Sequence, residues 1–202
     1  MEMIFRGAEA VVEKIKWQGF SAISKIRNKR SYRHPDLEER LVTERLRSES
    51  RVIERLLSEG VLVPALYEVN IAKSQIIMEF LDGLTLEKGL RTDEYQAYLV
   101  SSATILSQIH SSGIVHGDPT TSNFMISEDF YAIDFGLSTF NDDAESRASD
   151  LRVFLESLEA HHSEISGREI FLEAYSKWNS SKEVLEALDV LELRGRYNLM
   201  RG

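Results

Sequence analysis

Polar residues that could hold a metal ion and move a proton lie close together in one part of the sequence. They are His116, Asp118, Asn123 and Asp134, with Gly117 between the first two. Asn123 follows Asp118 by five residues, and Asp134 follows Asn123 by eleven. Two carboxylates and one amide are hard oxygen ligands of the kind that Mg²⁺ prefers. Each of these residues is also common in turns for purely local reasons, so an ordinary turn is the alternative for any one of them.

A second candidate is Glu49, which interrupts an apolar stripe in a long helical stretch. At helical spacing the stripe consists of Val42, Leu46, Ile53 and Leu56. Burying an unpaired carboxylate is costly, so Glu49 should have a cationic partner or lie at the mouth of a cleft. The nearest upstream candidate is Lys25, on the same strand face as Ile23. The alternative is a slight rotation of the helix that lets Glu49 reach water.

The first part of the chain has the pattern of a small antiparallel sheet with one long helix. Strands are predicted over residues 3–5, 10–17, 20–27, 66–69 and 75–81. A charged and aliphatic stretch without Gly or Pro predicts a helix over 36–59, with Gly60 ending it. The pattern breaks at Asp82 and Gly83, so we expect an N-terminal lobe over residues 1–81.

Residues 82–202 are expected to form a mostly helical C-terminal lobe. Apolar spacing predicts an amphipathic helix over 94–111, with Asp93 and Gln96 as its capping pair. Loops and short strands follow over 114–136, and helical patterns dominate after about Ala144. Strands first and helices later indicate an α+β protein.

The composition excludes several classes of protein. The chain has 202 residues, 43% of them hydrophobic and 28% charged, which is typical of a globular protein and not of a disordered one. It has no cysteine, which excludes thiolate metal sites and fits a cytoplasmic location. No apolar run is long enough for a membrane span, so no membrane association is expected.

The net charge of −9 argues against a surface built entirely for nucleic acid. One local basic patch remains, formed by Lys25, Arg27, Lys29, Arg30 and Arg33. A solvated charged turn is the simpler interpretation of most of these residues.

Taken in chain order, Lys25, Glu49, His116-Gly117-Asp118, Asn123 and Asp134-Phe135-Gly136 resemble the protein-kinase-like fold from residue 7 to about residue 160. The resemblance implies a bilobal α+β protein that uses ATP and Mg²⁺. Lys25 would hold the nucleotide phosphates and be oriented by Glu49. Asp118 would orient or deprotonate the attacking hydroxyl or water, and Asn123 and Asp134 would hold Mg²⁺.

The same resemblance implies nucleotide contacts from Gly7, Met78, Glu79 and Phe80, the last at the hinge that meets the adenine. The sequence also departs from the ordinary kinase pattern. Gly7 stands alone where a glycine-rich loop is expected, and position 117 is Gly where typical protein kinases have Arg. Control by a phosphorylated activation loop is therefore not expected. No Ala-Pro-Glu element follows Gly136, so the platform that docks a peptide substrate is missing.

A narrower resemblance covers nearly the whole chain. It rests on Ser31-Tyr32-Arg33-His34-Pro35, His116-Gly117-Asp118, Thr120-Thr121-Ser122-Asn123 and Arg194-Gly195-Arg196-Tyr197. These motifs are similar to those of the small atypical kinases of the KEOPS (EKC) complex. The resemblance implies partnership with the threonylcarbamoyl-transferase subunit and other KEOPS subunits in the N6-threonylcarbamoyl modification of tRNA. It also implies Mg-ATP hydrolysis or Ser/Thr phosphorylation, with the basic patch and tail arginines Arg194, Arg196 and Arg201 as candidate tRNA or partner contacts.

Two other functions remain open at this point. A small-molecule kinase is one, because His-Gly-Asp-x₄-Asn also occurs in aminoglycoside- and choline-kinase-like enzymes, although 202 residues scarcely allow their acceptor-binding insert. A non-catalytic nucleotide-binding scaffold is the other.

Three further predictions concern single residues. Asp150 resembles the kinase aspartate that braces the catalytic loop, with a helix N-cap as the alternative. His116 resembles a structural histidine, and His161 and His162 indicate a helix end.

Overall fold

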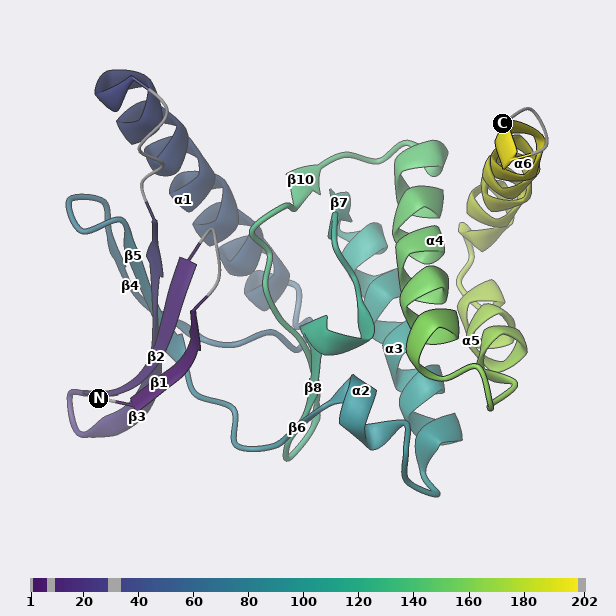
Figure 1. Cartoon of the computed structure of the whole chain (residues 1–202), viewed down its shortest axis with the longest axis horizontal. Coiled ribbons are helices and arrows are strands. Elements are labelled where there is room, and N and C mark those ends of the chain that lie inside the picture. The colour runs from purple at the N-terminus through teal and green to yellow at the C-terminus, as the bar shows by residue number, and fades with distance from the viewer. Residues whose placement is uncertain (1, 7–9, 29–33, 200–202) are drawn as a thin grey trace. The chain divides into compact units, whose positions relative to one another are not determined.

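The computed structural model describes the chain except for residues 1, 7–9, 29–33 and 200–202 (Figure 1). The chain divides into two compact units, Met1–Asp82 and Gly83–Gly202. Gly7 and the basic residues at positions 29, 30, 33 and 201 lie outside the described residues.

The first unit contains a five-stranded antiparallel sheet in the order β1-β2-β3-β5-β4. Its strands are β1 (Glu2–Arg6), β2 (Ala10–Trp17), β3 (Phe20–Arg27), β4 (Leu66–Asn70) and β5 (Gln75–Glu79). Gln18 and Gly19 have φ values of 48° and 91°, so they connect β2 and β3 as a two-residue turn. The predicted strands are confirmed, although β5 ends two residues before the predicted position 81.

One long helix, α1 (Pro35–Ser58), accompanies this sheet. Pro35 begins it, and Gly60 follows its end with a φ of 76°, which only Gly adopts readily. The predicted apolar stripe is buried and contributes Val42, Leu46, Ile53 and Leu56 to the core. The helix contacts β4 and β5, and the buried residues Ile76 and Ile77 come from β5. The predicted helix is therefore confirmed.

The second unit begins with short strands that hold two loops together. β6 (Leu84–Thr85), β8 (Phe124–Ile126) and β9 (Phe130–Ala132) form one antiparallel sheet, and β7 (Ile114–Val115) pairs with β10 (Thr139–Phe140). Beside the β8–β9 pair, the Ile133 amide donates to the Asn123 carbonyl at 2.9 Å. The loops that follow β7 and β9 are thereby fixed to each other.

Helices make up most of the remainder of this unit. They are α2 (Leu86–Gly89), α3 (Tyr95–Ser111), the 3₁₀ helix η1 (Thr121–Asn123), α4 (Ala144–His161), α5 (Gly167–Ser176) and α6 (Ser181–Leu199). The predicted helix over 94–111 is confirmed, but its predicted capping pair is wrong. Glu94 occupies the N-cap of α3 and makes no side-chain capping hydrogen bond. None of the helices in the described part of the chain combines the length and apolar character of a membrane span.

Stacked aromatic rings form the centre of the second unit. The rings of Phe154 in α4 and Phe171 in α5 lie with their centroids 4.1 Å apart, and Phe124 meets Phe154 edge-on at 5.8 Å. Tyr175 packs against Phe171, and all four side chains are fully buried. This cluster joins β8, α4 and α5, so it supports the loop that precedes β8.

Phe154→Ala should destabilise the chain by about 3–5 kcal/mol, because it removes a fully buried ring and leaves a cavity. The free energy of unfolding in urea measures this loss. Phe140→Ala, at a ring that is 55% exposed, is the control and should change stability by less than about 1 kcal/mol. Equal effects of the two substitutions would contradict the assignment of Phe154 to the core.

Candidate functional site

In the first unit, Lys25 of β3 and Glu49 of α1 form a buried ion pair. Lys25 Nζ lies 2.7 Å from Glu49 Oε1, and the two residues are 8% and 1% exposed. A buried carboxylate needs such a partner to offset the loss of its hydration. The predicted cationic partner of Glu49 is confirmed, and the alternative that Glu49 faces water is wrong.

Arg27 is a second cation on the same carboxylate, which the sequence prediction missed. Its guanidinium contacts Glu49 Oε2, and Arg27 is only 7% exposed. Its placement in a surface basic patch is therefore wrong, as is that of Lys25. The two-residue period of a strand could have revealed Arg27 as a partner of Glu49, because residues 25 and 27 lie on one face of β3.

The residues predicted to contact the nucleotide lie at and just beyond the end of β5. Met78 pairs with Ile23 of β3 and Leu66 of β4. Glu79 Oε2 accepts the Ala65 amide at 3.1 Å, and Lys14 places its ammonium 3.6 Å from the Phe80 ring centroid. The contact of Met78, Glu79 and Phe80 with a nucleotide stays a prediction.

In the second unit, the structure brings Asp118 and Asn123 together. The Asn123 side-chain amide donates to the Asp118 carbonyl at 2.8 Å and to Asp118 Oδ2 at 3.1 Å. The Thr120 amide closes the turn by donating to the same carbonyl at 2.9 Å. Burial raises the pKa of the Asp118 carboxyl above its ordinary value. A half-buried carboxyl of this kind is suited to proton transfer.

Asp150 of α4 braces the backbone of the loop that carries Asp118. Its carboxylate is 1% exposed and accepts the amides of His116 at 2.6 Å and Gly117 at 2.8 Å. The predicted bracing role is confirmed by these contacts. The alternative that Asp150 caps a helix is wrong, because Asp143 caps α4 by accepting the Ser146 amide at 2.8 Å.

Two further buried side chains complete the brace. His110 Nε2 lies 3.1 Å from Asp150 Oδ2, and His110 Nδ1 lies 2.7 Å from the Tyr175 hydroxyl. An ionised carboxylate only accepts, so we assign the ring proton to Nε2, and the Tyr175 hydroxyl then donates to Nδ1. Burial lowers the pKa of His110 and raises that of Tyr175, which keeps the imidazole neutral and the phenol protonated. The prediction missed Tyr175 because it lies 65 residues away in sequence from His110.

Gly117 is required by its surroundings. Its φ is 84°, and a Cβ added there would lie 2.3 Å from the Leu137 carbonyl oxygen. No side chain fits at that distance, and the backbone conformation itself disfavours any residue other than Gly. In this conformation the contact with residue 137 leaves no room for an Arg side chain at position 117.

His116 connects the Asp118 loop to the loop that carries Asp134. The Asp118 amide donates to His116 Nδ1 at 3.3 Å, and Nε2 donates to the Ile133 carbonyl at 3.1 Å. The imidazole packs on the buried Phe135 ring, with centroids 4.9 Å apart. These contacts confirm the prediction that His116 is a structural brace.

Asp134 is exposed and has a φ of 61°, and its Oδ1 accepts the Gly136 amide at 3.2 Å. Its charge contributes to the raised pKa of Asp118. The described residues contain no group of three or more His, Cys, Asp and Glu side chains arranged for a metal. Such a group is not needed for Mg²⁺ beside a nucleotide, because one or two carboxylates and the substrate phosphates commonly hold it.

The predicted helix end at His161 and His162 is confirmed, because α4 ends at His161 and His162 follows as its C-cap.

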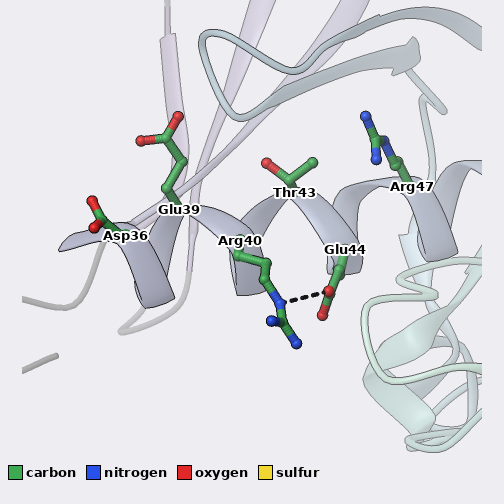
Figure 2. A pocket seen from close by; sticks show the side chains of 6 residues that line it. All are labelled: Asp36, Glu39, Arg40, Thr43, Glu44 and Arg47. Atoms are coloured by element: carbon green, nitrogen blue, oxygen red, sulfur yellow. Dashed lines mark hydrogen bonds and ion pairs between the residues drawn. The ribbon is translucent and has the colours of Figure 1, made fainter. Parts of the chain in front are cut away.

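A separate surface pocket lies along α1 and is lined by Asp36, Glu39, Arg40, Thr43, Glu44 and Arg47 (Figure 2). Arg40 and Glu44 form an exposed ion pair at 3.0 Å within it. It contains none of the predicted site residues.

The fold resembles that of solved kinase-like proteins. A WaaP structure in complex with acyl carrier protein matches with a TM-score of 0.66 and 18% identity, over 97% of this chain and 86% of that chain. Rio2 kinase from Chaetomium thermophilum, solved as an ADP/Mg²⁺-phosphoaspartate complex, matches with a TM-score of 0.64 and 16% identity, over 96% and 72%. The predicted α+β protein-kinase-like fold is confirmed by this likeness.

The family follows from the sequence match. Residues 37–166, more than half of the chain, match the ABC1 atypical kinase-like domain. The chain therefore belongs to the ABC1 atypical kinase-like domain family.

Curated relatives share the name "Probable bifunctional tRNA threonylcarbamoyladenosine biosynthesis protein". The relative from Methanococcus vannielii is 34% identical over 197 residues, and that from Methanospirillum hungatei is 38% identical over 196 residues. The matches cover 96% and 95% of this chain but only 36% of each relative. The chain thus spans little more than a third of the length of these relatives.

The buried histidines predict loss of stability in mild acid. Burial lowers the pKa of His110 and His116 below the ordinary 6.5. The unfolded chain therefore binds more protons than the folded chain once the pH falls through about 6.5. We expect the free energy of unfolding in urea to decrease between about pH 7 and pH 5. The raised pKa of Asp118 has the opposite effect on stability, because the folded chain then holds that proton more tightly than the unfolded chain does. Constant stability across this window would contradict the neutral state assigned to the histidines.

Gly117→Ala should destabilise the chain by more than the ~1–2 kcal/mol that a left-handed conformation costs a non-glycine residue. The added Cβ would also collide with the Leu137 carbonyl. Gly113→Ala is the matched control, because Gly113 has a φ of 72° and open space around the added Cβ. Urea unfolding of both variants isolates the collision. Equal losses would show that the contact with residue 137 is unimportant.

Proposed function

We propose that this chain is a Mg-ATP-dependent phosphotransferase or ATPase. It would act as an atypical Ser/Thr kinase subunit of a KEOPS-type complex in tRNA N6-threonylcarbamoyladenosine biosynthesis. The observation that carries the proposal is the Asp118–Asn123 pair, with hydrogen bonds of 2.8 and 3.1 Å. His116 and Asp150 hold this pair on a rigid loop.

Asp118 is the proposed catalytic residue. Burial raises the pKa of its carboxyl, which brings it closer to the range in which a carboxylate can accept a proton from a hydroxyl or a water. The Asn123 amide holds Oδ2 of this carboxylate in one orientation. A fixed orientation matters because phosphoryl transfer depends mainly on positioning and electrostatics.

The side chains of Asn123 and Asp134 fit Mg²⁺. Asn123 uses its NH₂ group to donate to Asp118, and its Oδ1 is the oxygen suited to a hard cation. Asp134 supplies an exposed carboxylate on the neighbouring loop. When bound, the metal would neutralise charge that develops on the transferred phosphoryl group.

The proposed nucleotide contacts come from residues of the first unit. Lys25, fixed by Glu49 at 2.7 Å, is proposed to hold phosphates. Met78, Glu79 and Phe80 are proposed to contact the nucleotide, with Phe80 at the hinge that meets the adenine, and Gly7 is proposed to approach the phosphates.

The role in tRNA modification rests on the relatives. Their printed name is a bifunctional tRNA threonylcarbamoyladenosine biosynthesis protein, and this chain matches 36% of their length. We propose that this chain acts together with the threonylcarbamoyl-transferase subunit and other KEOPS subunits. Arg194 forms an exposed ion pair with Glu145 at 2.9 Å, and its contact with tRNA or a partner stays a proposal.

Asp118→Asn should lower single-turnover phosphate release from radiolabelled Mg-ATP by about 10²–10⁴-fold, the usual effect of removing a positioned acid–base group. Asp134→Ala should abolish release at Mg²⁺ concentrations that saturate the wild-type chain. Asp129→Asn, at an exposed residue of the same unit, is the matched control and should leave the rate unchanged. Each chain is assayed with and without the transferase partner.

The destination of the label separates the possible reactions. Labelled protein indicates a protein kinase, with phosphoamino-acid analysis separating Ser/Thr from an aspartyl phosphate, and free phosphate alone indicates an ATPase. Equal and negligible turnover by the wild-type and Asp134→Ala chains, even with the partner, would overturn catalysis and favour a nucleotide-binding scaffold.

A further inference from the structure

We propose that Ser157 of α4 is a positioning residue that holds Asn123 in the place from which it binds Mg²⁺ beside the nucleotide. Ser157 acts through Thr121, which its hydroxyl contacts in η1. This inference rests on the Mg-nucleotide binding of the proposed function. It adds a side chain that lies outside the motifs identified in the sequence.

The Ser157 hydroxyl reaches η1, outside its own helix. Serines inside helices commonly donate to the carbonyl three or four residues earlier, as Ser149 of α4 does to Glu145 at 3.0 Å. Ser157 Oγ instead accepts the Thr121 amide at 3.1 Å and lies 3.1 Å from the Thr121 hydroxyl. These two contacts fix the position of Thr121 relative to α4.

Burial makes this contact hard to replace. Thr121 is only 1% exposed, so its amide and hydroxyl are shielded from water. Buried polar groups of this kind need hydrogen-bond partners within the protein. If Ser157 lost its hydroxyl, the Thr121 amide would lose an acceptor and could regain one only if η1 moved.

Asp150, Phe154 and Ser157 form one stripe along α4, because they are four and three residues apart. Asp150 accepts the two backbone amides that precede Asp118, and Phe154 meets the Phe124 ring edge-on at 5.8 Å. The seven residues from Asp150 to Ser157 span roughly 10 Å of helix axis. α4 therefore holds the loop at three separate points.

Asn123 lies between two of these points. Thr121 precedes it by two residues, and Phe124 follows it directly. The Asn123 amide donates to the Thr120 carbonyl at 2.9 Å, and its carbonyl accepts the Ile133 amide at 2.9 Å. The backbone that carries the proposed metal ligand is thus fixed on both sides.

A fixed backbone matters for the proposed metal site. The NH₂ group of Asn123 is committed to Asp118, so the direction of Asn123 Oδ1 depends on where the backbone places this side chain. Mg²⁺ demands nearly ideal octahedral geometry, so it is sensitive to a displaced ligand. Removing a group that orients a metal ligand typically weakens metal binding by about 10–100-fold.

The test measures how much Mg²⁺ increases the affinity of the whole chain for ADP, a nucleotide that allows no turnover. Dissociation constants for ADP are measured by calorimetry with Mg²⁺ and with EDTA, and their ratio is the Mg²⁺-dependent gain. The variants are Ser157→Ala, Ser157→Thr and Thr121→Val. Ser149→Ala is the matched control, because Ser149 is an exposed serine that bonds to its own helix. Urea unfolding establishes that each chain is folded.

Ser157→Ala should reduce the Mg²⁺-dependent gain by about tenfold and leave ADP affinity in EDTA unchanged, because Ser157 acts on a metal ligand and not on the nucleotide. Hydrogen exchange at the Thr121 amide should accelerate, because the amide loses its acceptor. Ser157→Thr keeps the hydroxyl and should restore most of the gain, and Ser149→Ala should match the wild type. Thr121→Val keeps the amide contact and should reduce the gain by about threefold.

Two results would overturn the inference. One is an unchanged Mg²⁺-dependent gain in Ser157→Ala. The other is an equal loss of ADP affinity with Mg²⁺ and with EDTA, which would show a merely structural role. If Ser157→Ala does not fold, an unchanged gain in Thr121→Val would overturn the inference instead.

The outcome for the proposed function can be separated from this one. A chain that binds Mg²⁺ and ADP in a Ser157-dependent manner but never turns over ATP would overturn catalysis and support this inference. A wild-type chain whose ADP affinity does not respond to Mg²⁺ would overturn both.

Discussion

The hydrogen-bonding requirement of one buried carboxylate organises the second unit. Asp150 is 1% exposed, and a charge so deeply buried is tolerated only if donors surround it. The donors come from the backbone of His116 and Gly117 and from the ring of His110. The loop that carries Asp118 therefore takes its shape from a helix residue more than thirty positions away.

A buried carboxylate also needs partners in the first unit, where they are of a different kind. Glu49 is as deeply buried as Asp150, but side-chain cations satisfy it instead of backbone amides. Backbone amide donors hold a loop in place, whereas the two cations join β3 to α1 through the Glu49 carboxylate. The same burial requirement thus fixes a loop in one unit and joins a strand to a helix in the other.

The absence of a side chain at position 117 has a steric basis. The Leu137 carbonyl oxygen lies 2.3 Å from the position that a Cβ of residue 117 would take, so the segment after Asp134 packs directly on the loop before Asp118. β7 and β10 pair at Val115 and Thr139, two residues before position 117 and two residues after position 137. This pairing and the close contact at Gly117 hold the two loops together.

The sequence alone determined the parts of this protein that depend on near neighbours. The limits of α1 follow from Pro35, the apolar period and Gly60. The spacing of Asp118 and Asn123 marked both as candidate site residues, and the structure added the hydrogen bond between them. The sequence also indicated that Glu49 needs a cation, because a charge in an apolar stripe is costly. The resemblance of these motifs to kinase-like proteins added the fold.

Only the tertiary structure decided which distant groups meet. It placed Arg27 inside the first unit and not on its surface, and it set Asp150 within α4 and not at its N-cap. It also brought Tyr175 to His110 across 65 positions of the chain. The physical reason is that hydrophobic period, capping and turn signals act over a few residues. A buried charge or polar group instead selects its partner from whatever the packed elements bring within hydrogen-bonding distance.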